Sequence, residues 1–164
     1  MNEPMTVILA SRNAGKIREL GELLSTYDIH VLGLDSFPGI GDIEETGRTF
    51  EENALLKART VTQLTGHICI ADDSGLEVDA LDGAPGIHSA RYADDWHSLD
   101  GESRDERNMR KLLSVLSKLP DAPRSARFVC CMAAVKPDFL EGRDLVVRGT
   151  WEGSILDAPR GQNG

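Results

Sequence analysis

The stretch Thr6-Val-Ile-Leu-Ala-Ser-Arg-Asn-Ala-Gly-Lys16 turns from apolar to polar near its midpoint. Its first part, 6–10, is short, apolar and rich in residues favoured in strands, so it predicts a buried strand. Asn13 is of a type that caps helices. Behind it, apolar residues recur on one helical face: Ile17, Leu20, Leu23, Leu24 and Tyr27. The stretch therefore predicts a strand, a polar turn and a helix.

Strands and helices alternate through most of the remaining chain. Short apolar runs predict further strands at 29–34, 67–71, 128–135 and 144–151. The last two have no helix between them, which predicts an antiparallel pair. The pattern indicates an α/β protein with a mixed twisted sheet flanked by helices.

Two further helices carry their own signals. Thr49 and Glu52 have the spacing of a capping box, and the helix behind them has an apolar face of Phe50, Ala54, Ala58 and Val61. A helix at 103–119 ends before two prolines. Its apolar face consists of Met109, Leu112, Leu113, Leu116 and Leu119.

Composition narrows the classes of partner. The net charge of −9 argues against a nucleic-acid or anionic-membrane partner, because no basic cluster could neutralise a phosphate backbone. No apolar run is long enough for a membrane helix. With 164 residues, of which 40% are hydrophobic, the chain fits a soluble domain with one substantial core or two small lobes. A phosphate site here would need backbone amides, a few lysines or a divalent cation.

The cysteines predict a reducing compartment. Cys69, Cys130 and Cys131 are odd in number and form no CxxC pair. The neighbours Cys130 and Cys131 would point to opposite faces of a strand, which does not suit a shared metal ion. All three are interpreted as buried free thiols of a cytoplasmic protein.

Two polar segments follow predicted buried strands, where ligands bind in open α/β sheets. In 11–16, Gly15 lets backbone amides approach an anion, and Lys16 can reach a phosphate. An ordinary turn is the alternative, because the Walker pattern is absent. In 71–75, Asp72 and Asp73 directly follow an apolar strand. Burying two carboxylates there costs free energy unless they bind a cation such as Mg²⁺ or accept hydrogen bonds. Capping of a turn is the alternative there.

Four more polar residues are candidates for metal or phosphate binding, on residue type alone. Glu44 and Glu45 lie in a loop at 35–47, and Asn53 and Lys57 lie one helical turn apart. The two glutamates could supply further metal ligands, and Lys57 could bind phosphate. Taken by themselves, all four are interpreted as surface residues.

Six motifs occur in order along the chain. They read ASRNAGK at 10–16, EETG at 44–47, ENALLKA at 52–58, ADDSGL at 71–76, GAPG at 83–86 and SARY at 89–92. In this order they resemble the inosine/xanthosine triphosphate pyrophosphatase (Ham1-like) family, and the resemblance extends from about residue 6 to residue 164. It implies a two-lobed fold with a central cleft, a homodimer, and Mg²⁺-dependent hydrolysis of ITP, dITP and XTP to the monophosphate and pyrophosphate.

The resemblance also implies roles by position. Asp73 would bind the metal and accept the proton of the attacking water, and Glu44 would be a second metal ligand. Asp72 and Lys57 would support the metal and phosphate region. The substrate would be held by Ser11, Arg12, Asn13, Ala14, Gly15, Lys16 and Ser74.

The family pattern continues beyond the end of this sequence. After Pro-Arg-Gly-x-x-Gly it has an aromatic-Gly-Tyr-Asp segment, a lysine and a Ser-His-Arg element that contribute to recognition of the base. Residues 1–164 are therefore expected to form a single two-lobed pyrophosphatase domain that is incomplete at its C-terminus and has little base selectivity.

Three alternatives to this function are open. A Maf-like nucleotide pyrophosphatase has a related fold, but the 11–16 loop and the Asp-Asp-Ser-Gly block favour the inosine-triphosphate group. A non-catalytic nucleotide-binding protein would retain the motifs without turnover. A structural domain with solvated loops would require six ordered motifs to be coincidental.

Overall fold

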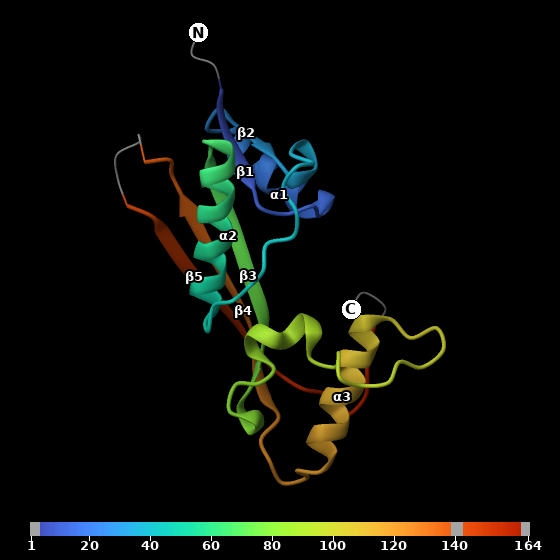
Figure 1. Cartoon of the computed structure of the whole chain (residues 1–164). Coiled ribbons are helices and arrows are strands. Elements are labelled where there is room, and N and C mark those ends of the chain that lie inside the picture. The colour runs from blue at the N-terminus through green and yellow to red at the C-terminus, as the bar shows by residue number, and fades with distance from the viewer. Residues whose placement is uncertain (1–3, 139–142, 162–164) are drawn as a thin grey trace. The chain divides into compact units, whose positions relative to one another are not determined.

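A five-stranded sheet with the strand order β2-β1-β3-β4-β5 organises the chain (Figure 1). The computed structural model describes residues 4–138 and 143–161. Strand β1 is parallel to both of its neighbours, whereas β4 and β5 run in opposite directions (Figure 1). The predicted mixed α/β sheet is thus confirmed. The strands are β1 Met5–Leu9, β2 Ile29–Leu32, β3 Ile68–Val78, β4 Ser125–Val135 and β5 Leu145–Ser154.

The contacts divide the chain into two compact units. The first unit comprises Met1–Asp73 and Cys131–Arg148, and the second comprises Ser74–Cys130 and Gly149–Gly164. Strands β3, β4 and β5 each pass from one unit to the other. The central cleft implied by the resemblance stays a prediction.

Helices α1, Ala14–Ser25, and α2, Phe50–Thr65, belong to the first unit. The side chain of Asn13 accepts a hydrogen bond from the amide of Lys16, and Thr49 accepts one from the amide of Glu52. Both predicted caps are therefore confirmed. The returning arm of the capping box is displaced by one residue, because Glu52 accepts from the amide of Arg48.

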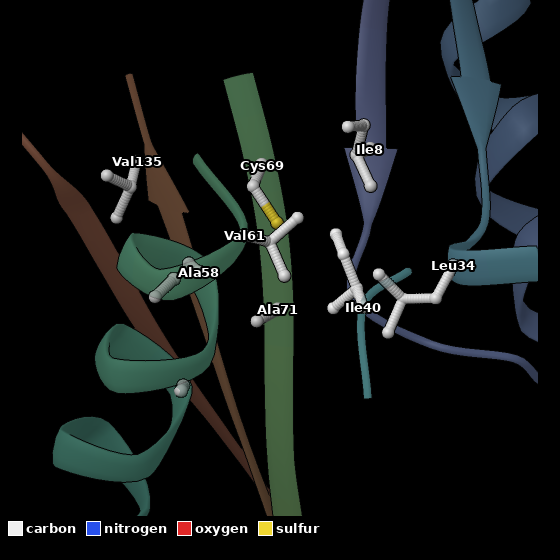
Figure 2. Packing of buried hydrophobic residues seen from close by; sticks show 10 residues of the cluster. Ile8, Leu34, Ile40, Ala58, Val61, Cys69, Ala71 and Val135 are labelled. Carbon is white, nitrogen blue, oxygen red and sulfur yellow. The ribbon is translucent and has the colours of Figure 1, made fainter. Parts of the chain in front are cut away.

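The core of the first unit lies where α2 packs on the sheet (Figure 2). All four residues of the predicted α2 face are buried, which confirms that face. By contrast, α1 has no buried residue: Leu23 of its predicted apolar face is 70% exposed, and Tyr27 lies beyond the end of the helix and is 74% exposed. The buried cluster consists of Ile8, Leu34, Ile40, Ala54, Ala58, Val61, Cys69, Ala71, Ala133 and Val135.

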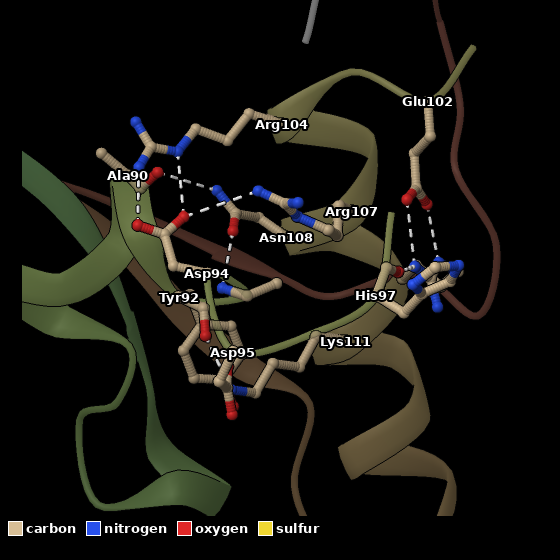
Figure 3. A network of polar contacts seen from close by, with 12 residues as sticks. Ala90, Tyr92, Asp94, Asp95, His97, Glu102, Arg104, Arg107, Asn108 and Lys111 are labelled. Carbon is tan, nitrogen blue, oxygen red and sulfur yellow. Dashed lines mark hydrogen bonds and ion pairs between the residues drawn. The ribbon is translucent and has the colours of Figure 1, made fainter. Parts of the chain in front are cut away.

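The second unit is built around α3, Arg104–Ser117. Ser103 and Glu106 form a complete capping box at its start. Leu112 and Leu116 are buried against Val78 and Ala126, whereas Leu119 lies beyond the helix and is 39% exposed. Figure 3 shows the polar network that joins α3 to the segment at 90–102. The short 3-10 helices are Leu34–Ser36, Asp79–Leu81 and Gly86–Arg91.

The cysteines differ in exposure. Cys69 and Cys131 are buried free thiols, as predicted, but Cys130 is exposed. The prediction of burial was wrong for Cys130 because neighbouring strand residues point to opposite faces, and only one face of β4 is covered at this point. Among the described residues, no helix is both long enough and apolar enough to cross a membrane.

Candidate active site

Two of the predicted polar segments meet in the first unit. Strand β1 runs parallel to β3 with Leu9 opposite Ile70, and the amide of Ala10 donates to the carbonyl of Ile70 at 2.8 Å. The loop 11–16 therefore begins beside the first half of β3. From α1, the ammonium of Lys16 reaches the Asp72 carboxylate at 2.7 Å.

The loop 11–16 is held by its own side chains. The hydroxyl of Ser11 accepts from the amide of Asn13 at 3.0 Å, and Asn13 in turn caps the amide of Lys16 at 3.1 Å. The first amides of a helix have no acceptor within it. Since the side chain of Asn13 already accepts from the amide of Lys16, the amides of Ala14 and Gly15 are left as the donors for an anion.

Arg12 contacts a different part of the chain from Lys16. Its guanidinium donates to the carbonyl of Ile40 at 2.5 Å and pairs with Asp42 at 3.3 Å and with Asp35 at 3.9 Å. Arg12 thus fastens the loop 35–47 to the start of α1. Its part in holding a substrate, implied by the resemblance, stays a prediction.

The Asp-Asp-Ser-Gly block is not a loop. Strand β3 continues through it to Val78, so the predicted end of the strand at residue 71 was wrong. Alternation along the strand sends Asp72 and Asp73 to opposite faces. Asp72 meets Lys16, whereas Asp73, only 7% exposed, lies on the face of Cys69 and Ala71. The carboxylates are accommodated inside a strand because each has a hydrogen-bond donor from another element.

Asn53 of α2 supplies that donor to Asp73. Its Nδ2 lies 2.9 Å from Oδ2 of Asp73, and its Oδ1 accepts from the amide of Gly47 at 2.8 Å. The residue is completely buried, so its interpretation as a surface residue was wrong. A signal was present in the sequence: Asn53 follows Phe50 by three residues, which places it on the buried face of the helix.

Lys57 is also less exposed than predicted. Its side chain is 16% exposed, and its ammonium lies 2.8 Å from Oε1 of Glu45. Both side chains of this pair are therefore partly covered, at 16% and 25% exposure, rather than fully solvated. Glu44, next to Glu45, is exposed as predicted.

The exposed Ser74 follows Asp73 in β3 and belongs to the second unit. There it lines a pocket with Gly75, Ser89, Phe128 and Trp151. A second apolar pocket of this unit, of about 550 Å³, lies beside α3 and is lined by residues such as Leu76, Met109, Leu113 and Trp151.

The donor types in the first unit suit a hard cation. Mg²⁺ is commonly held by one or two carboxylates together with water and substrate phosphates. Glu44 and Asp73 are carboxylates, which are the oxygen ligands that Mg²⁺ prefers. Within residues 4–138 and 143–161, no three His, Cys, Asp or Glu side chains form a metal-binding cluster.

Known proteins resemble the chain over nearly its whole length. The dITP/XTP pyrophosphatase of Nitratidesulfovibrio vulgaris is 58% identical over 159 residues, which are 97% of this chain and 75% of the relative. The dITP/XTP pyrophosphatase of Bacillus cereus is 45% identical over 165 residues, covering 100% of this chain and 77% of the relative.

Solved structures agree with this similarity. A Ham1 protein from Coxiella burnetii superposes with a TM-score of 0.86 at 40% identity, over 98% of this chain and 77% of that one. A nucleoside-triphosphatase, or dITP/XTP pyrophosphatase, from Mycobacterium abscessus gives 0.81 at 42% identity, over 98% and 79% of the two chains. A model of the Ham1 family matches residues 7–164. The chain belongs to the Ham1 family.

Proposed function

We propose that this chain hydrolyses non-canonical purine nucleoside triphosphates, namely dITP, XTP and ITP, to the monophosphate and pyrophosphate. The observation that carries the proposal is the meeting of two segments in the first unit. The turn at 11–16, which leads into the N-terminus of α1, lies beside the stretch of β3 that holds Asp72 and the buried Asp73. The names of the relatives support the substrate class.

In this proposal, different residues of the first unit bind the phosphates and activate the attacking water. The amides of Ala14 and Gly15 and the ammonium of Lys16 bind phosphate oxygens. Asp73 accepts a proton from the water that attacks the α-phosphorus. The bond from that phosphorus to the bridging oxygen breaks, and pyrophosphate leaves with the bridging oxygen. One water is consumed for each monophosphate and pyrophosphate formed.

We also propose Mg²⁺ as the cofactor, with Asp73 and Glu44 as the residues that would hold it. When bound, the ion supplies the positive charge that a triphosphate needs next to several carboxylates. Lys57, which contacts Glu45, and Asp72, which contacts Lys16, would keep the surrounding charges in place. Ser74 would contact the substrate. We also propose that the protein forms a homodimer and works in the cytoplasm.

The test is pyrophosphate release from dITP, XTP and ITP, with dATP, ATP and GTP as matched standard purines. We expect equimolar monophosphate and pyrophosphate in the presence of Mg²⁺ and none after addition of EDTA. Release of orthophosphate would contradict the reaction, and nucleotide binding without release would favour a non-catalytic binder. A preference for dITP over dATP would show that residues 1–164 suffice for base selectivity.

A further inference from the structure

Asn53, a buried polar side chain of the first unit, has no role among those proposed above. Asn53 has 0% relative exposure, and both ends of its amide are engaged. A buried amide costs free energy unless its donors and acceptor find partners, so this position needs those two contacts.

The partners determine how the amide is oriented. The Gly47 amide can only donate, so it must face the Oδ1 of Asn53. The Nδ2 group can only donate, so it must face an acceptor, and the Asp73 carboxylate is that acceptor. The two contacts are therefore not interchangeable, and the side chain has one orientation.

Gly47 is fitted closely to this arrangement. A Cβ atom placed on Gly47 would lie 2.6 Å from Oδ1 of Asn53, 2.8 Å from the Cβ of Glu52 and 3.0 Å from the Asn53 amide nitrogen. Two of these neighbours cannot move away easily, because they belong to the backbone or the root of a side chain on α2. Only glycine lets the loop approach α2 so closely.

The three residues come from three different elements. Gly47 ends the loop that carries Glu44 and Glu45, Asn53 lies in the first turns of α2, and Asp73 lies within β3. A single rigid amide thus connects the loop carboxylates to the carboxylate of β3. A ligand set drawn from separate elements works only if such contacts hold its members together.

We propose that Asn53 is a positioning residue: it fixes the orientation of the Asp73 carboxylate and holds the Glu44-bearing loop beside it through Gly47. The inference rests on the proposed function, because Asp73 and Glu44 act there. Loss of such an outer contact lowers metal affinity or turnover by about 10-fold to 100-fold.

Two variants separate the two contacts. Asn53→Asp keeps an acceptor for the Gly47 amide but places a carboxylate against Asp73, and Asn53→Leu removes both contacts with little change of volume. For each folded variant, we expect kcat with dITP to fall at least 10-fold while KM for the nucleotide changes by less than about 3-fold. A kcat within 2-fold of the parent chain in either variant would overturn the proposal.

Thr62→Val is the matched control. Thr62 is another buried polar residue of α2, and its hydroxyl donates to the carbonyl of Val135 at 3.3 Å. Its loss should lower the melting temperature without changing kcat. If Thr62→Val lowered kcat as much as the Asn53 variants, a merely structural role for Asn53 would explain the results and the proposal would fail.

Two measurements do not depend on turnover. The Gly47 amide should exchange its hydrogen slowly in the parent chain and at least 10-fold faster in Asn53→Leu. Mn²⁺ titrated into the nucleotide-free chain should bind more weakly to Gly47→Ala, which displaces the loop and leaves Asp73 unaltered. Fast exchange in the parent chain, or unchanged Mn²⁺ affinity in Gly47→Ala, would overturn the proposal. If the parent chain released no pyrophosphate, the proposed function would fail while these measurements still tested Asn53.

Discussion

The ammonium of Lys16 lies 2.7 Å from a carboxylate oxygen of Asp72, and this ion pair joins the first turn of α1 to the middle of β3. The lysine is half exposed, whereas the aspartate is mostly covered. Asp72 therefore holds the Lys16 ammonium beside β3, while the lysine side chain as a whole stays about half exposed. Because an ion pair that is exposed to solvent adds little to the free energy of unfolding, its main effect is to position the Lys16 side chain.

Lys16→Ala should raise KM for dITP about 10-fold, because it removes one charged contact to the triphosphate worth about 1.4 kcal/mol. Steady-state kinetics across dITP and dATP would measure the change. Lys118→Ala, at an exposed lysine after α3, is the control and should leave KM unaltered. A change confined to the preference between bases would contradict the phosphate role.

Asp73→Asn should lower kcat by about 10²-fold to 10⁴-fold, because the amide cannot accept the proton of the attacking water. The fold should persist, since the volume is nearly unchanged and an amide oxygen can still accept from Asn53. Pyrophosphate release and near-ultraviolet circular dichroism would be measured together. Full activity in a folded Asp73→Asn chain would remove Asp73 from the catalytic role.

Leu116→Ala should destabilise the second unit by about 2–5 kcal/mol, because Leu116 is fully buried among Val78, Leu112 and Ala126. Both tryptophans, Trp96 and Trp151, belong to this unit, so urea unfolding followed by their fluorescence reports on it. Leu119→Ala removes the same atoms at an exposed site. Equal losses of stability in the two variants would contradict the packing around α3.

Acid should destabilise the second unit through carboxylates of the network in Figure 3. The hydrogen bond from Arg110 lowers the pKa of Glu102 to about 2, below the value of about 4.3 expected in an unfolded chain. A lowered pKa in the folded state stabilises at pH values above the unfolded pKa. This contribution is lost as the pH falls from about 4.3 towards 2.

The matching measurement is urea unfolding by tryptophan fluorescence at pH 7, 4 and 3. Glu102→Gln should make the stability less dependent on pH over this interval, whereas Asp121→Asn, at an exposed carboxylate in the same unit, should not. The same pH dependence in Glu102→Gln as in the parent chain would exclude Glu102 as a source of the acid effect.

The three thiols should differ in reactivity. Burial raises the pKa of Cys69 to about 12, so its reactive thiolate is scarce at pH 8. Cys131 is buried as well, and Cys130 is exposed. A disulfide reagent should therefore label one thiol in the folded chain and three in urea. Cys130→Ser should abolish the folded-state reaction, and persistent labelling in that variant would mean that a buried thiol becomes accessible.

Local features of the fold could be predicted from the sequence. Asn13 and Thr49 start helices because their side chains accept from amides three residues ahead. The buried face of α2 and the strands of the mixed sheet follow from the spacing of apolar residues. The six ordered motifs also predict membership of the Ham1 family, whose model matches residues 7–164. Each of these signals is contained in a few neighbouring residues.

Only the tertiary structure determines which side chains that are distant in the sequence contact each other. The sequence placed Asn53 on the surface and ended β3 before Asp72, because polar residues are usually exposed and often end strands. Packing of α2 on the sheet instead buries Asn53, 20 residues away from its partner Asp73. Likewise, α1 brings Lys16 to Asp72 across 56 residues. Hydrogen bonds made across such separations satisfy polar groups that local propensity would place in solvent, and no local pattern records them.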